Sequence, residues 1–181
     1  MSSGNWWIAI GLAVMGFWMV GAHNRVVGLR AAIAEAWSQV DALLARRDAA
    51  LIALAKQLWE LWPAGRATLD ALAAAQHQLQ TAAMSVRGKP ARATSVATLQ
   101  AAEDALGATV ARLLNQVQAD EPLATHEDVA AQLLVLFEAG PHLLQARQRF
   151  NQACRSYNAA IQQFPTSLLV PVFRFESAGS F

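Results

Sequence analysis

The chain has 181 residues, of which 55% are hydrophobic and 15% are charged, and its formal net charge is +1. Its mean hydropathy of +0.25 favours membrane association. The near-zero net charge excludes a global basic field of the kind that recruits nucleic acid or anionic lipid. The single cysteine, Cys154, excludes an intrachain disulfide and suits a reducing compartment.

Residues 1–27 are predicted to form a transmembrane anchor. A run of 17 residues beginning at Trp6 carries no charge, and the first charged side chain of the chain is Arg25. At about 1.5 Å per residue the run covers roughly 25 Å, and a snorkelling Arg25 extends it toward a hydrocarbon core of ~30 Å. Trp6 and Trp7 are expected at one membrane interface, and Trp18 is a third tryptophan of the anchor.

A cleaved signal peptide is the alternative to an anchor, because the small residues of 20-VGA-22 suit a peptidase. No lysine or arginine precedes the apolar run, however, and this favours an uncleaved anchor. Arg25 and Arg30 follow the run. The positive-inside bias therefore predicts an N-terminus outside the cell and a cytoplasmic location for residues 23 onward.

Residues 28–164 are predicted to form four helical segments separated by breakers. The breakers are 62-WPAG-65, 87-RGKPARATS-95 and 120-DEP-122. The segments between them are rich in Ala, Leu, Gln and Arg, which favours helix over strand. We expect Ser95 to cap the third segment and Thr125 to open the fourth in a capping-box-like sequence, THED.

Apolar residues in each segment recur in alternating steps of four and three, which is the spacing of a heptad seam. The seam of the first segment is Ile33, Trp37, Val40, Leu44, Arg47, Leu51, Leu54, Leu58 and Leu61. The seams of the other segments include Gln76, Glu103 and Arg147. Four seams joined by short turns predict an all-α fold, in which a single transmembrane helix precedes an antiparallel up-down-up-down four-helix bundle. The first and fourth helices are the longest and should form a stalk toward the membrane.

Arg47 and Glu103 are charged residues at seam positions of two different segments. Arg47 lies 15 residues from Trp62 and Glu103 lies 14 residues from Val117, so both reach nearly the same layer of the bundle. Buried charges must be paired, and a guanidinium binds a carboxylate well. The hypothesis is a buried Arg47–Glu103 pair that fixes the register of the bundle. The alternative is that both side chains snorkel to water.

Three stretches of the chain resemble the LemA family of membrane-anchored bacterial proteins. They are 29-LRAAIAEAWSQVDALLARR-47, 120-DEPLATHEDV-129 and 146-ARQRFNQACRSYNAAIQQFP-165. The chain departs from the family pattern at Ile52-Ala53, where the family has Pro-Asn, and at Phe150, where it usually has tyrosine. The tail from residue 165 to residue 181 is only loosely similar. The resemblance implies an N-terminal anchor in the bacterial inner membrane and a long helical bundle, and it carries no catalytic function.

No pattern in the sequence predicts catalysis, so we expect a non-enzymatic protein without metal or cofactor. The four histidines are scattered, and Glu138 and His142 are one residue too far apart for the Glu-x-x-His motif of di-metal bundles. Cys154 lies on an apolar seam and is expected to be a core residue. The sequence has no glycine-rich phosphate loop and no basic-aromatic stripe. We therefore expect no small-molecule substrate and no nucleic acid partner.

Phe150, Asn151, Tyr157 and Asn158 form two pairs seven residues apart and should line one side of the fourth segment, opposite Trp37. One interpretation is ordinary helix packing with internally bonded amides. The other is a stalk surface for a protein partner or for self-association.

The tail, residues 165–181, is apolar with two proline breakers and is predicted to lie against the membrane interface or the stalk. Gly140-Pro141 should kink the fourth helix and act as a hinge, because proline removes a backbone donor. The predicted function is a membrane-tethered scaffold or adaptor. The alternative is a sensor or regulator of an envelope protease or signalling protein, in which the hinge and the ion pair make the bundle switchable.

Overall fold

The computed structural model describes residues 4–164, 166–168, 170 and 175–181. Its long helices are α1 (Gly4–Leu61), α2 (Arg66–Gly88), α3 (Ala93–Ala119) and α5 (Glu127–Gln162). Short turns of helix are η1 (Pro63–Gly65), α4 (Glu121–Ala124) and η2 (Thr166–Leu168). The described residues contain no strand, although Arg92 and Ala178 form an isolated β-bridge. The all-helical class predicted from the sequence is therefore confirmed.

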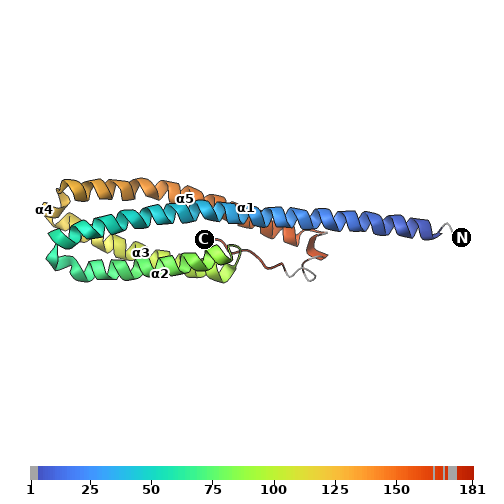
Figure 1. The fold of residues 1–181 in the computed structure, drawn as a ribbon, viewed down its shortest axis with the longest axis horizontal. Coiled ribbons are helices and arrows are strands. Elements are labelled where there is room, and N and C mark those ends of the chain that lie inside the picture. Colours follow the sequence, from blue (N-terminus) through green and yellow to red (C-terminus); the bar gives the residue numbers. More distant parts are fainter. Residues whose placement is uncertain (1–3, 165, 169, 171–174) are drawn as a thin grey trace.

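The four long helices lie lengthwise beside one another as two pairs, α1 with α5 and α2 with α3 (Figure 1). Helix α1 extends furthest, and its N-terminal end projects alone beyond the other helices (Figure 1). The described C-terminal residues, 175–181, lie between the two pairs (Figure 1). The paired part of the structure is where the candidate site lies.

Helix α1 is longer than the sequence predicted, because the anchor and the first bundle helix form one continuous helix of 58 residues. No proline interrupts this stretch, and Gly28, the glycine closest to the expected boundary, has open space around it. Helix α5 likewise stays helical through Gly140-Pro141. The apolar N-terminal segment and the first segment of residues 28–164 are thus parts of one helix.

Two predicted helix starts are wrong. Helix α3 begins at Ala93, and Ser95 is buried inside it with its Oγ 3.0 Å from Ser85 Oγ. The hydroxyl therefore bonds across to α2 and does not cap its own helix. Thr125 follows the last residue of α4 and donates its hydroxyl hydrogen to the carbonyl of Glu121, the first residue of that helix. Helix α5 starts two residues after Thr125, without a side-chain cap. Thr125, which was expected to cap the start of α5, therefore bonds to the short helix α4 that precedes it.

Most seam positions belong to the core. Ile33, Val40, Leu54 and Leu58 of α1 are fully buried, as are many seam residues of the other three long helices. Leu61, the last residue of α1 and of the first seam, is 42% exposed. Burial of one stripe on every long helix accounts for their side-by-side packing, since an amphipathic helix is stabilised by covering its apolar face.

Candidate functional site

Two asparagines of α5 hold the described end of the tail, residues 175–181. Asn158 Nδ2 donates to the Ala178 carbonyl at 2.9 Å, and its Oδ1 accepts from Ala178 N at 2.7 Å. Asn151 repeats this pairing with Phe181, at 3.3 Å to the carbonyl and 2.9 Å from the amide nitrogen. The asparagines are seven residues apart and so lie on one face of the helix, and each satisfies both backbone groups of a residue in the tail.

Aromatic side chains fill the space between the two asparagines. Tyr157 is fully buried and donates its hydroxyl hydrogen to the Glu176 carbonyl at 3.1 Å. Phe150 is also fully buried, with its ring centroid 6.0 Å from that of Trp37 and 5.3 Å from that of Phe181. These buried rings lie next to the half-buried asparagine pairings and reduce their contact with water, which strengthens the hydrogen bonds.

The arrangement agrees with the first of the two interpretations, helix packing with internally bonded amides, and not with a stalk surface open to partners. The five predicted residues do come together, but Trp37, Phe150 and Tyr157 are buried, and the amides of Asn151 and Asn158 are bonded to the chain itself. The physical reason is that an extended segment has unpaired backbone groups, and asparagine amides on an adjacent helix satisfy them. Residues 175–181 lie against the stalk, whereas residues 165, 169 and 171–174 are outside the described part of the chain.

The tail also contacts the turn between α2 and α3. Gly179 N donates to the Ala91 carbonyl at 3.3 Å, next to the bridge between Arg92 and Ala178. A Cβ added at Gly179 would lie 2.5 Å from Ala93 Cα, so only glycine permits this close approach. The tail therefore connects the α1–α5 pair to the closed end of the α2–α3 pair.

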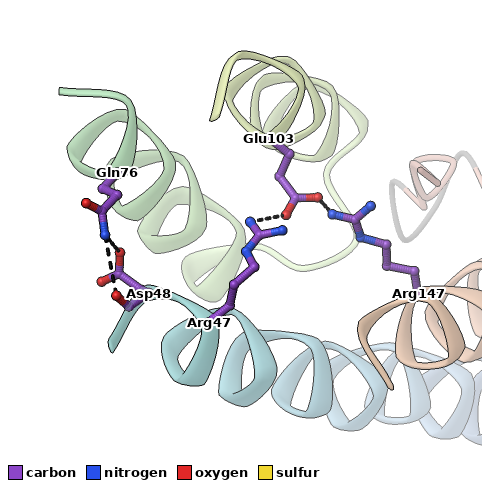
Figure 2. A network of polar contacts seen from close by, with 5 residues as sticks. All are labelled: Arg47, Asp48, Gln76, Glu103 and Arg147. Carbon is purple, nitrogen blue, oxygen red and sulfur yellow. Dashed lines mark hydrogen bonds and ion pairs between the residues drawn. The ribbon is translucent and has the colours of Figure 1, made fainter. Parts of the chain in front are cut away.

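A second group of polar residues lies deeper in the structure, around Glu103. Arg47 Nη2 is 2.9 Å from Glu103 Oε1, so the structure forms the pair that the register of the seams predicted. Arg147 of α5 contacts the other carboxylate oxygen, Oε2, from the opposite side (Figure 2). The side chain of Glu103 is 6% exposed, whereas those of Arg47 and Arg147 are 23% and 27% exposed. We call these three residues the charge cluster.

Arg147 is the member of the charge cluster that the sequence analysis missed, although it stands on the fourth seam. The position of Arg147 along the helices could not be found by counting residues from the preceding turn, because the short helix α4 lies between α3 and α5. Its ring partner is Phe181, whose centroid lies 5.3 Å from the guanidinium carbon. The cluster and the tail thus meet at Arg147 through a cation–π contact.

A polar contact to α2 lies beside the charge cluster. Gln76 Nε2 donates to Asp48 Oδ1 at 2.6 Å, and Gln80 Nε2 donates to Asp48 Oδ2 at 2.7 Å. Figure 2 shows Asp48 directed toward Gln76, away from the carboxylate of Glu103. Asp48 is therefore engaged by two amides of α2, and Glu103 is the carboxylate that neutralises Arg47 directly.

The environment of the cluster disfavours its positive charges. Burial lowers the pKa of Arg47, and the neighbouring Asp48 opposes that effect. Burial also lowers the pKa of Arg147, and repulsion from Arg47 lowers it further. Arginine has so high an ordinary pKa that both side chains stay charged at neutral pH. Two cations then share the carboxylate of Glu103, and the carboxylate of Asp48, which is bonded only to neutral amides, lies next to Arg47 as a second negative charge.

Cys154 is fully buried on the α5 seam, and burial raises its thiol pKa from 9.0 to about 11. This environment suits an apolar core residue and opposes formation of a nucleophilic thiolate. Among the described residues no three His, Cys, Asp or Glu side chains gather in a way that could hold a metal ion.

The family model of the LemA family matches residues 36–181. The chain belongs to the LemA family. The match includes the tail, which the sequence analysis judged only loosely similar, and so it covers the asparagines, the charge cluster and the segment that they hold. No curated protein and no solved structure is significantly similar to this LemA protein. Family membership supports an association with the cell envelope.

Two described helices of the LemA protein, α1 and α5, have the length and composition to cross a membrane. The apolar window is 6% buried in α1 and 22% buried in α5. In α5 Phe150 and Tyr157 are core residues, whereas Phe137 is exposed. In α1 the apolar residues near the N-terminus are exposed, with Trp6 at 70% and Phe17 at 83%.

Proposed function

We propose that this LemA-family protein is a membrane-anchored, non-enzymatic scaffold or adaptor. The observation that carries the proposal is the exposed apolar end of α1, which continues without a break into the paired helices. An uncharged run with aromatic residues at its end has a lower free energy in a bilayer than in water. A stiff helix that leaves the membrane would hold the rest of the chain at a fixed distance from it.

The remainder of the chain is an antiparallel up-down-up-down four-helix bundle in this proposal. Reversals of the chain at η1, at the turn between α2 and α3, and at α4 support that topology. The bundle lies in the cytoplasm next to the bacterial inner membrane, with the N-terminus outside. Arg25 and Arg30, which follow the apolar run, support this orientation through the positive-inside bias.

A protein partner or a second copy would dock on an apolar stripe of α5 formed by Leu134, Phe137 and Leu144. Their side chains are 60%, 60% and 59% exposed, respectively. The predicted stalk surface is covered by the tail, so this stripe replaces it as the surface for a partner. Contiguous exposed apolar side chains on a folded helix are typical of interaction sites.

Photocrosslinking from intact bacterial membranes tests the proposal. A photoreactive residue at Leu134 or Leu144 should capture one protein reproducibly, while the same probe at Met84, an exposed residue of α2, should not. Capture of lipid alone at both stripe positions would contradict an adaptor. Reporter fusions at the two ends of the protein would test the orientation in the same cells.

The alternative function is a regulator or sensor of an envelope protease or signalling protein, based on a switchable bundle. The charge cluster favours it, because the cluster joins α1, α3 and α5 in the core through one shared carboxylate. Gly140-Pro141 would be the hinge, two turns from Arg147. A change in hydrogen exchange across α5 on addition of the captured partner would support regulation, and unchanged exchange would support a static scaffold.

A further inference from the structure

A pocket of about 200 Å³ opens between α1, α3 and α5, at the level of the charge cluster. Its walls are Leu51 of α1, Leu106, Gly107 and Val110 of α3, and Leu133 and Phe137 of α5, among others. The helices pack as two pairs, and α3 and α5 belong to different pairs, which leaves this apolar space between them.

Arg47 is the only ionisable residue that lines the pocket within the described part of the chain. Its guanidinium uses Nη2 to bind Glu103, and no other hydrogen bond of Arg47 is formed with described residues. A guanidinium has five N–H donors in a fork that fits a second carboxylate. The remaining N–H donors of Arg47 are therefore at one side of an otherwise apolar pocket.

The size of the pocket sets the size of an occupant. An apolar protein cavity of about 150 Å³ holds a benzene molecule. A pocket of about 200 Å³ accordingly holds an apolar tail of roughly six to eight carbon atoms. A ligand that matches both features has one negative charge and one short apolar chain.

We propose that this pocket binds a free medium-chain carboxylate, with the carboxylate on Arg47 and the chain among the leucines and Phe137. The ligand comes from solution. Arg47 is 25 residues beyond Ala22 on a continuous helix, or roughly 38 Å along its axis, so a lipid in the bilayer does not reach the pocket. The inference goes beyond the scaffold function and does not depend on it.

Isothermal titration of octanoate into the full-length protein in phosphatidylcholine nanodiscs tests the proposal, with empty nanodiscs as the blank. Gly107→Leu is the pocket variant, because a Cβ at Gly107 meets no atom within 4 Å and the larger side chain extends into the pocket. Ala108→Leu is the matched control, since this exposed neighbour on the same helix does not line the pocket. Octanol has a tail of the same length without the charge and tests the role of Arg47.

We expect saturable octanoate binding to the native protein and to Ala108→Leu, and at least ~10-fold weaker binding to Gly107→Leu. Octanol should bind more weakly than octanoate to the native protein, and Arg47→Met should remove that preference. Absence of octanoate binding, or equal binding to both leucine variants, would overturn the proposal. If octanoate does not bind and Gly107→Leu alters the oligomeric mass, the pocket is a contact between protein chains, and the proposal is also overturned.

Discussion

Asn158 and Ala178 exchange two hydrogen bonds, at 2.9 and 2.7 Å, so that a helix side chain pairs with the tail as a neighbouring strand would. The same pairing recurs between Asn151 and Phe181. Both pairings use backbone groups of the tail, so they fix its position along α5 whatever the side chains between them. Asparagine is suited to this role because its amide holds one acceptor and two donors at the end of a short side chain.

Replacing Asn158 by alanine should release the tail without unfolding the helices. The change leaves the backbone amide and carbonyl of buried Ala178 unpaired, and we expect a loss of about 1–3 kcal/mol. Hydrogen exchange should become faster over residues 175–181, while α1 and α2 remain protected. Asn115→Ala, at an exposed position of α3, is the control and should change neither quantity. Unchanged protection of the tail in Asn158→Ala would show that other contacts hold it.

Gly179→Ala should displace the tail for a steric reason. The new methyl group would lie 2.5 Å from Ala93 Cα, and a backbone atom at the start of α3 cannot move aside without distorting the helix. The bond from Gly179 to the Ala91 carbonyl should then be lost, and exchange of the tail should accelerate as in Asn158→Ala. Gly88→Ala, which has open space at its Cβ, is the control. A native exchange pattern in Gly179→Ala would contradict the described approach of the tail.

The core and the level of the charge cluster could be predicted from the sequence, because both follow from periodicity. A heptad seam fixes which face of a helix is buried, and nearly equal counts from two neighbouring turns brought Arg47 and Glu103 to one layer. Seam positions such as Leu54 and Phe150 are fully buried as a result. Helix starts were less predictable, because Ser95 and Thr125 bond to groups outside the helices they were expected to cap.

The sequence predicted a tail against the membrane interface or the stalk, but its register along α5 could not be predicted, because an extended segment with two prolines has no period to align it with a helix. The pair of asparagines seven residues apart on an aromatic face was the available signal. It indicated internally bonded amides as one interpretation but did not name their partner. Arg147 could not be placed for a related reason. The chain reaches α5 through the short helix α4, and the position of Arg147 along the helices depends on the geometry of that connection.

The thiol of Cys154 should be unreactive in the folded protein at neutral pH. Burial raises its pKa from 9.0 to about 11, so the native thiolate fraction is low, and thiol reagents should react much faster after denaturation. A raised folded-state pKa contributes stability that is complete below pH 9 and is lost as the pH rises toward 11. The free energy of unfolding should therefore fall over that interval, and Cys154→Ala should reduce the slope. Rapid labelling of the native protein at neutral pH would contradict the burial of this residue.

Single substitutions in the charge cluster should have unequal effects on stability. Glu103→Leu removes the carboxylate that two guanidinium groups share, and we expect a loss of about 3–5 kcal/mol. Arg47→Met should cost less, because Arg147 still neutralises Glu103. Chemical denaturation of the full-length protein measures both. Equal losses in the two variants would indicate that Arg147 does not share the carboxylate.

Combined substitutions distinguish a coupled cluster from three independent side chains. If Arg47 and Glu103 interact, the loss in the double variant Arg47→Met, Glu103→Leu should differ from the sum of the two single losses by about 0.5–3 kcal/mol. Additive losses would contradict the pairing. Adding Arg147→Met to the double variant removes the last charge of the cluster, and stability should recover, because an apolar replacement of a whole buried ion cluster is often neutral or stabilising. A native-like stability of the triple variant with altered helix pairing would show that the charges act on register more than on the free energy of unfolding.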